Sequence, residues 1–218
     1  MAKALHPATG IREAWALFRD LAATAPDHVM LAFGAGLGDV AYGLPDELAG
    51  KPTVTLSAYH SGDAMVAEKE LQPLIDHGPP LFASIKRQSY IELQRIFDDS
   101  LGWAHRVYTK GGFTDDLPNA ALDGLAEQLA TATATDSFGL WAQGGAIARV
   151  PEDSTAFTGR AARFQISSEC AWDDPALDES HIGWGRATFA VVEPFSRTGR
   201  YVNDIADSVW TASESVTC

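Results

Sequence analysis

The chain has 218 residues, of which 46% are hydrophobic and 21% charged, and 16 basic against 29 acidic residues give a net charge of −13. This balance excludes a disordered chain, a collagen-like repeat and a disulfide scaffold, and the length suits one large domain or two small ones. A strongly acidic chain is a poor partner for nucleic acid, because binding phosphates requires Lys and Arg. No apolar run approaches the roughly 20 residues that span a bilayer, and the N-terminus lacks the apolar region of a signal peptide. We expect a globular cytoplasmic protein with free thiols that binds neither nucleic acid nor membranes.

Helical and strand-like periodicities alternate in the first half of the chain. Ile11, Trp15 and Phe18 recur at helical spacing and predict a helix over residues 9–24, which Pro26 ends. The next predicted elements are a strand over 28–33, a glycine-rich loop or hairpin over 34–50, a strand over 53–59, a helix from 61 that Pro73 and the prolines at 79–80 stop, a short helix from the Ser89–Glu92 capping box to 97, and a strand over 105–110.

The second half of the chain continues this mixture. Leu122, Leu125 and Leu129 lie on one face of a helix that Pro118 begins. The remaining predicted elements are strands over 137–143 and 146–150, a hairpin-like element over 163–172, and a helix over 178–193. Because helices separate only some of the strands, the pattern predicts an α+β fold, an antiparallel sheet of about six or seven strands covered by helices.

Residues 36–41, Gly-Leu-Gly-Asp-Val-Ala, match the G-x-G-x-x-A pattern of dinucleotide-binding loops. Such a loop needs a helix that begins at the second glycine and points its N-terminus at pyrophosphate. Gly43, Pro45 and Gly50 prevent a long helix here. We therefore interpret the segment as an ordinary loop.

Other motifs that carry chemistry are weak. The six histidines show no H-x-x-x-H or H-x-E spacing, so the sequence predicts no metal site, and no G-x-S-x-G motif marks a serine nucleophile. The aspartate pairs at 98–99, 115–116 and 173–174 fall beside predicted element ends, where Asp commonly caps a helix or turn. Cys170 and Cys218 have no neighbouring base, and a strand cysteine is usually a small buried hydrophobe. These residues alone indicate only an α+β domain.

A series of short phrases runs through nearly the whole chain. They include HSGDAMVAEKELQPLIDHGPPL at 60–81, SYIELQRIFDD at 89–99, RVYTKGGF at 106–113, GGAIARV at 144–150, STAFTGRAARF at 154–164, HIGW at 181–184 and GRYVN at 199–203. In this order and spacing they resemble the C-terminal, substrate-binding half of berberine bridge enzyme-like FAD-linked oxidases, members of the vanillyl-alcohol-oxidase-type flavoproteins.

The resemblance implies an incomplete enzyme. No glycine-rich pyrophosphate loop or covalent flavin-attachment residue can be carried over, so we expect the family's N-terminal FAD-binding domain to be missing. Residues 1–203 are expected to form the substrate-binding domain. Residues 204–218 are expected to be an atypical or truncated tail, because the sequence departs from the family pattern at Asp204. FAD is the implied cofactor, and tight FAD binding by this chain alone is not expected.

The same resemblance implies site residues. Tyr201, in the Y-V-N phrase, is the candidate catalytic residue, whose phenol would help to remove a proton while hydride leaves a neighbouring carbon. The candidates for contact with the cofactor are Asn203, Gly144 and Gly145, and those for contact with substrate are Gln94 and Lys110. Each also has an ordinary structural explanation as a strand tyrosine, a β-bulge or an exposed polar side chain.

The implied function is a flavin-dependent oxidoreductase that oxidises a C–H bond of a small molecule next to oxygen or nitrogen, with this chain inactive alone. Two alternatives stay open: a non-catalytic α+β ligand-binding or dimerisation domain, and one half of a split enzyme. An FAD-binding domain or a second copy of the chain would then cover the exposed face of the sheet.

Overall fold

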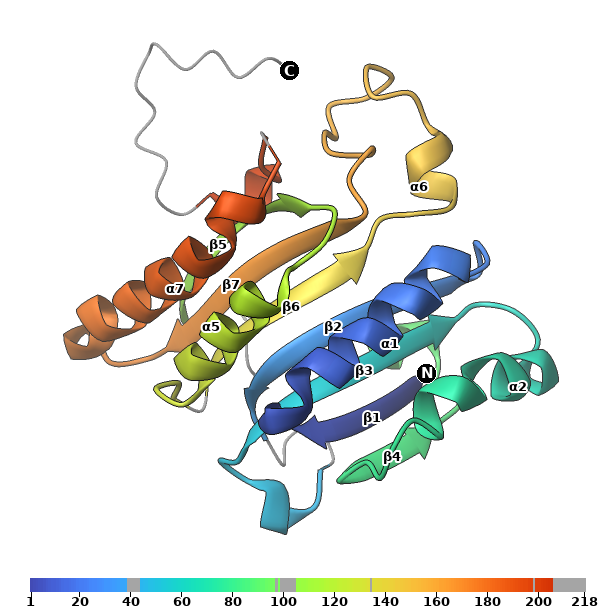
Figure 1. The fold of residues 1–218 in the computed structure, drawn as a ribbon, viewed down its shortest axis with the longest axis horizontal. Helices are drawn as coiled ribbons and strands as arrows, with labels where there is room; N and C mark the ends of the chain where they lie inside the picture. Colours follow the sequence, from blue (N-terminus) through green and yellow to red (C-terminus); the bar gives the residue numbers. More distant parts are fainter. Residues whose placement is uncertain (39–43, 97, 99–104, 134, 198, 206–218) are drawn as a thin grey trace.

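An antiparallel sheet of seven strands forms the centre of the computed structural model, which describes residues 1–38, 44–96, 98, 105–133, 135–197 and 199–205 (Figure 1). The strands follow the order β4-β1-β3-β2-β6-β7-β5, and every neighbouring pair is antiparallel. Their bounds are β1 Ala2–Pro7, β2 Val29–Leu37, β3 Pro52–His60, β4 Phe82–Ile85, β5 Arg106–Thr114, β6 Asp136–Ala142 and β7 Phe164–Trp172. The predicted α+β fold and the predicted strand number are confirmed.

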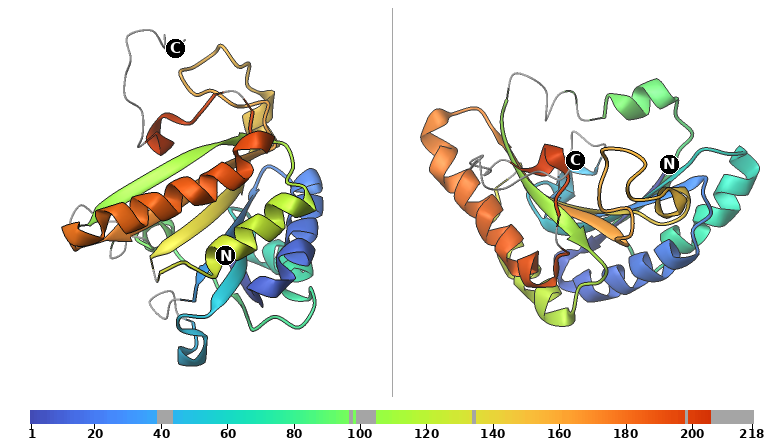
Figure 2. Two further views of the ribbon diagram at one scale, coloured as in Figure 1. Left: turned by 60° about the vertical axis from the view of Figure 1, so that its left-hand side comes forward. Right: turned by 90° about the horizontal axis from the view of Figure 1, so that it is seen from above.

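The long helices form a layer on one face of this sheet, as the right-hand view of Figure 2 shows. They are α1 Ile11–Thr24, α2 Ala64–Ile75, α5 Asn119–Leu129 and α7 Asp178–Val192. The short helices are α3 Tyr90–Gln94 and α6 Ala146–Arg149, with 3-10 turns at Ala8–Gly10, Asp46–Leu48, Pro175–Leu177, Glu193–Phe195 and Val202–Asp204. Neither short helix belongs to the layer, so within the described residues most of the opposite face carries no helix.

The main core lies between the helix layer and the sheet. Trp15 and Phe18 of α1 contact Phe33 of β2 and Phe164 of β7, with ring centroids 5.1 to 5.7 Å apart. All four rings are at most 2% exposed. Burying such rings is a large hydrophobic gain, and their edge-to-face contacts add a smaller one. This cluster explains why the predicted amphipathic helix at 9–24 docks where it does.

A smaller core lies under α7 at the β5 end of the sheet. Its buried members are Tyr108, Cys170, Trp172 and Trp184. The ring of Trp172 stacks on that of His181, at 4.8 Å and an interplanar angle of 9°. Burial in this cluster strongly raises the pKa of the Cys170 thiol above its usual value, with a further contribution from Asp136. Cys170 is thus the buried strand cysteine that the sequence predicts.

Several helix starts follow the local rules. The Asp63 carboxylate accepts hydrogen bonds from the backbone N–H groups of Met65 and Val66 and caps α2. Ser89 and Glu92 form the predicted capping box of α3, with both reciprocal hydrogen bonds present. These local interactions fix where α2 and α3 begin.

The structure corrects some predicted elements. Strands β1 and β4 are not predicted from the sequence, because β1 contains no β-branched residue, Phe, Tyr or Trp and β4 has only four residues. They are held by pairing with each other, and β1 also pairs with β3. The predicted strand over 146–150 is instead α6, because the positive φ of Gly145 turns the chain out of β6. Pro73 lies inside α2 rather than ending it. The hairpin-like element predicted over 163–172 is instead the single strand β7, Phe164–Trp172, between β5 and β6.

Some predictions fall outside the described residues. These are Asp39 to Ala41 of the glycine motif, Asp99, and the tail from residue 206, which includes Cys218. The described part of the glycine motif ends β2, where the Gly38 N–H donates to the Lys51 carbonyl and starts the β2–β3 connection. None of the helices in the described ranges is long and apolar enough to cross a membrane.

Candidate functional site

The sheet face away from the long helices is the candidate site. Side chains alternate along a strand, so the neighbours of the core residues Leu31, Phe33, Val54 and Leu56 point to this open face. On the central strands these are mostly small or polar: Met30, Ala32, Gly34 and Gly36 of β2, Thr53, Thr55, Ser57 and Tyr59 of β3, Ser137, Gly139 and Trp141 of β6, and Gln165, Ser167 and Glu169 of β7. The face therefore combines a flat, glycine-containing centre with hydrogen-bonding groups.

A hollow of about 360 Å³ lies over the central strands of this face. Trp141 and Met30 give it apolar walls, and Gln143, Gln165 and Glu169 give it polar ones. A mixture of apolar walls and a few polar groups is typical of small-molecule sites.

Two glutamines and an aspartate form a hydrogen-bonded chain beside the hollow. The Gln143 amide donates to the Gln165 carbonyl oxygen at 3.3 Å, and the Gln165 amide donates to an Asp204 carboxylate oxygen at 2.8 Å. Burial raises the pKa of Asp204, while this bond from Gln165 lowers it. Gln143 is only 5% exposed, and its carbonyl oxygen has no hydrogen-bond partner within the described ranges. A buried acceptor without a donor is costly, so turning the Gln143 amide toward the hollow to meet the N–H or O–H group of a ligand would relieve that cost.

Glu169 contributes the carboxyl group of the hollow. Its Oε1 accepts a hydrogen bond from the Ser167 hydroxyl at 3.0 Å. Desolvation by burial raises the pKa of Glu169, and the nearby Asp204 raises it further. A carboxyl group with a raised pKa is a stronger base when ionised, which suits Glu169 to take a proton from a ligand.

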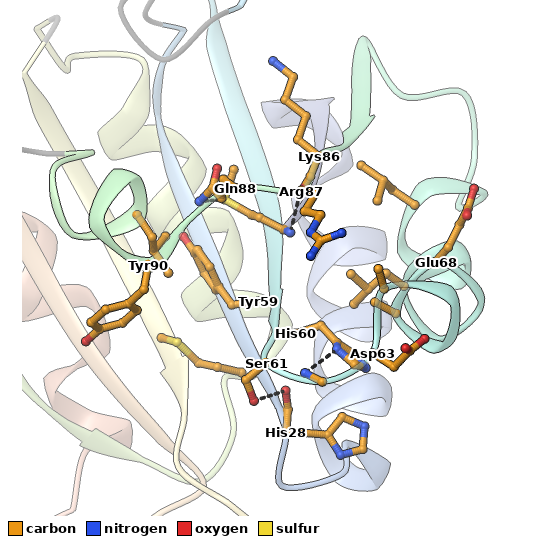
Figure 3. A pocket seen from close by; sticks show the side chains of 18 of the residues that line it. His28, Tyr59, His60, Ser61, Asp63, Glu68, Lys86, Arg87, Gln88 and Tyr90 are labelled. Carbon is orange, nitrogen blue, oxygen red and sulfur yellow. Dashed lines mark hydrogen bonds between the residues drawn. The ribbon is translucent and has the colours of Figure 1, made fainter.

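A larger hollow of about 690 Å³ adjoins the central one, and Met30 lines both (Figure 3). It lies between the end of β3, helix α2 and the segment that joins β4 to α3. Tyr59, Lys86, Arg87 and Tyr90 line this larger hollow. The two hollows together give the open face room for more than one part of a small molecule.

The six candidate residues from the sequence lie at four places, two of which border the open face or its hollows. Tyr201 and Asn203 lie together, the Asn203 amide donating to the Tyr201 hydroxyl at 2.9 Å. The following residue, Asp204, contacts Gln165, so this segment borders the open face. Gln94 lies on α3, one turn after Tyr90 of the larger hollow, and donates to the Tyr90 hydroxyl at 2.7 Å.

The other three candidates, Lys110, Gly144 and Gly145, do not lie on the open face. The Lys110 ammonium lies 5.8 Å from the centre of the Phe189 ring of α7, on the helix-covered side. Gly144 and Gly145 form the turn after β6, and a Cβ on Gly145 would come within 2.9 Å of an Asp27 carboxylate oxygen. This turn gives Gly145 a structural reason to be glycine. The roles of all six candidates stay predictions.

A flavin would fit these residues only in part. Gly34 leaves open space on this face, whereas the Trp141 ring already lies over Gly139 and would have to turn away for a flat ring to stack there. No glycine-rich loop leads into a helix of useful length in the described chain, since α6 after Gly144 and Gly145 has four residues. Such a loop and helix N-terminus are the usual cradle for pyrophosphate. The described residues thus suit the ring side of FAD and not its diphosphate.

Comparison with solved structures decides what kind of fold this is. BBE-like #28 from Arabidopsis thaliana superposes with a TM-score of 0.72 at 15% identity, covering 98% of this chain and 47% of that one. Physcomitrella patens BBE-like 1 gives 0.71 at 14% identity, with 94% and 45% covered. The chain has the fold of part of a berberine bridge enzyme-like oxidase. A variant of berberine bridge enzyme itself, solved in complex with (S)-reticuline, gives 0.69 at 17% identity, with 94% and 43% covered.

A curated relative agrees with this fold. It is an uncharacterized FAD-linked oxidoreductase, YvdP, of Bacillus subtilis (strain 168), 27% identical over 147 residues, which cover 61% of this chain and 31% of the relative. No family model matches the chain. The chain thus spans between about a third and a half of the berberine bridge enzyme-like and FAD-linked proteins that it resembles.

Sequence reasoning missed the central hollow. Trp141, Gln143, Gln165 and Glu169 carry no motif, and they belong to two strands and the turn after one of them. A signal was present in β7, where polar residues at 165, 167 and 169 alternate with apolar ones. That alternation marks a solvent-facing side, but it does not tell which strands lie beside it.

Proposed function

We propose that this chain supplies the substrate-side part of a flavin-dependent oxidoreductase that oxidises a C–H bond next to oxygen or nitrogen. The observation that carries the proposal is the sheet face opposite the long helices with its central hollow, whose lining includes both a buried acceptor and a carboxyl group of raised pKa. The fold likeness to berberine bridge enzyme-like oxidases supports the same interpretation.

The residues of the hollow suit such a reaction. Oxidising an alcohol or amine carbon removes a hydride and a proton, and a bound flavin would supply the hydride acceptor. Glu169 would accept the proton, since its raised pKa makes the carboxylate a better base. The free carbonyl oxygen of Gln143 would accept a hydrogen bond from the substrate hydroxyl or amine. Tyr201 is a second candidate for proton removal, from the border of the same face.

The proposal requires the open face to bind a flat flavin ring. We would add lumiflavin, which has the ring without the diphosphate, to isotope-labelled protein and follow amide and indole signals by NMR. Shifts are expected at Trp141 and at the side-chain amides of Gln143 and Gln165. Trp141→Ala should weaken binding at least tenfold, and Glu127→Gln, on exposed α5, should leave it unchanged.

Two outcomes would contradict the proposal. One is an absence of shifts up to the solubility limit of lumiflavin. The other is a set of shifts confined to the helix layer. Binding of lumiflavin and FAD with equal, weak affinity would support the proposal together with the expected lack of a diphosphate site.

A further inference from the structure

Three side chains with metal-binding atoms meet at one end of the larger hollow, outside the central hollow. His28 immediately precedes β2, His60 ends β3, and Glu70 lies on α2. The antiparallel register pairs Val29 with His60 and so places His28 beside the end of β3. The Ser61 N–H donates to the His28 carbonyl at 3.0 Å and closes this end of the hairpin. Figure 3 shows the two imidazoles at the same end of the hollow.

The three ligand atoms are close enough to share one ion. The Nε2 atoms of His28 and His60 lie 2.9 and 3.2 Å from the same Glu70 oxygen, Oε2, and all three atoms are within 4.8 Å of one another. Zinc bonds of about 2.0 to 2.2 Å in tetrahedral geometry separate neighbouring ligand atoms by roughly 3.3 to 3.6 Å. Both contacts to Glu70 are shorter than this spacing, so a small movement of Glu70 away from the two histidines, with adjustment of the rings, would make room for an ion.

We propose that His28, His60 and Glu70 form a binding site for one divalent transition-metal ion of the Zn²⁺ class, with water at the remaining positions. Two imidazole nitrogens with one carboxylate oxygen are a donor set that suits zinc, copper or nickel. Ca²⁺ and Mg²⁺ prefer sites made of oxygen atoms alone. The donor set therefore selects the class of ion.

Nearby carboxylates are committed elsewhere, which leaves Glu70 as the third ligand. Asp27, next to His28, is paired with Arg149. Asp63 caps α2 through the Met65 and Val66 amides. The Glu70 carboxylate, by contrast, is directed at the two histidines. It is therefore the carboxylate in position to share an ion with them.

Metal binding would change the proton on His60. The Gly62 N–H donates to His60 Nδ1 at 3.0 Å, so the neutral ring carries its proton on Nε2 and donates it to Glu70. Coordination through Nε2 requires that proton to move to Nδ1 and the Gly62 bond to break. Gly62 lies in an exposed turn, where water can replace the ring as acceptor. The His60 side chain is only 2% exposed, so coordination also requires this turn to move until the new Nδ1–H group reaches an acceptor.

The test is a metal titration of the untagged full chain after treatment with a chelator. Competition with a chromogenic zinc chelator should give one Zn²⁺ per chain, and Co²⁺ should give the visible absorption of a tetrahedral site. Glu70→Gln and His28→Gln should each weaken Zn²⁺ binding at least tenfold. The control is His105→Gln, which removes a histidine that contacts a carboxylate elsewhere on the protein, that of Asp173. This variant should leave the Zn²⁺ affinity unchanged.

A thermal melt adds a second measurement that separates binding from misfolding. Zn²⁺ should raise the melting temperature of the wild-type chain and of His105→Gln, and it should not raise that of Glu70→Gln. The proposal is overturned if the wild type binds Zn²⁺ no better than Glu70→Gln does. It is equally overturned if both Glu70→Gln and His28→Gln keep wild-type affinity.

Discussion

Asp136 and His181 form a buried pair between β6 and α7. One Asp136 oxygen lies 2.7 Å from His181 Nδ1, the other accepts the N–H and hydroxyl of Thr133, and both side chains are at most 5% exposed. Asp136→Ala leaves the buried His181 ring without its partner, whereas exposed Thr133 can bond to water, so we expect a loss of about 3 to 5 kcal/mol in the free energy of unfolding, measured with urea.

The exposed pair of His105 and Asp173 provides the control, because its 2.7 Å contact is similar but Asp173 is 77% exposed. Asp173→Ala should change stability by less than about 1 kcal/mol. Equal losses of unfolding free energy in Asp136→Ala and Asp173→Ala would show that burial does not make the Asp136–His181 pair the stronger one.

Tyr201 tests the proposed chemistry at a single atom. Its hydroxyl accepts a hydrogen bond from exposed Asn203, which can bond to water instead. Tyr201→Phe should therefore change the stability of the isolated chain by less than about 1 kcal/mol. In an assembly that contains a flavin-binding domain, the same change should lower kcat by about 10²- to 10⁴-fold with little effect on KM. Unchanged turnover there would reject a catalytic role.

At the scale of elements, two glycines of α7 test how closely this helix approaches the sheet. A Cβ on Gly185 would come within 2.8 Å of the Tyr108 ring and 3.3 Å of the Cys170 sulfur, whereas a Cβ on Gly183 meets nothing within 4 Å. Gly185→Ala should destabilise the protein by about 1 to 3 kcal/mol because the helix must move away. Gly183→Ala should stabilise it by about 0.5 to 1 kcal/mol, since alanine favours the helix. Denaturant unfolding distinguishes these signs, and the same sign for both would be evidence against the close approach.

The cap of α3 should depend on pH. Hydrogen bonds from the Ser89 backbone and side chain hold the pKa of Glu92 below its usual 4.5. Because the pKa of Glu92 is lower in the folded cap than in the unfolded chain, the ionised carboxylate stabilises the cap fully above pH 4.5. This stabilisation is lost as the pH falls from 4.5 through the lowered pKa of the folded state. Hydrogen-exchange protection of the α3 amides should fall in acid, and Glu92→Gln should show weaker protection at neutral pH with little further loss. Equal acid sensitivity in both proteins would rule out this cap as the cause.

At the scale of the whole molecule, the open face lacks a covering layer. Met30 lies where its two hollows meet and is 44% exposed. Exposed apolar surface of this kind promotes association, so we expect concentration-dependent dimers in sedimentation velocity. Met30→Glu should weaken dimerisation at least tenfold. Met65→Glu, at an 80% exposed position on α2, is the matched control and should have no effect. A monomer at every concentration would contradict this prediction.

The sequence predicted an element correctly where its residues recur with the period of a helix or strand, or where its own side chains accept hydrogen bonds from the backbone N–H groups at a helix start. The helix at 11–24, the Ser89–Glu92 cap and the buried Cys170 were predictable for that reason. The fold resemblance was carried by phrases spread along the chain, and the superposed structures agree with it. Where the pairing partner is distant, prediction failed: β1 is a strand because β3 and β4 flank it.

The sites depended on tertiary structure to a greater extent. His28 and His60 are 32 positions apart, so no spacing rule for metal ligands finds them, and only the β2–β3 register brings their rings to 4.7 Å. Likewise, Gln143 and Gln165 meet because β6 pairs with β7. The sequence by itself determined the periodic faces, caps and composition, because these depend on neighbours along the chain. The tertiary structure alone decided which face stays open and which polar groups share a hollow, because those depend on strand order and on contacts between residues far apart in sequence.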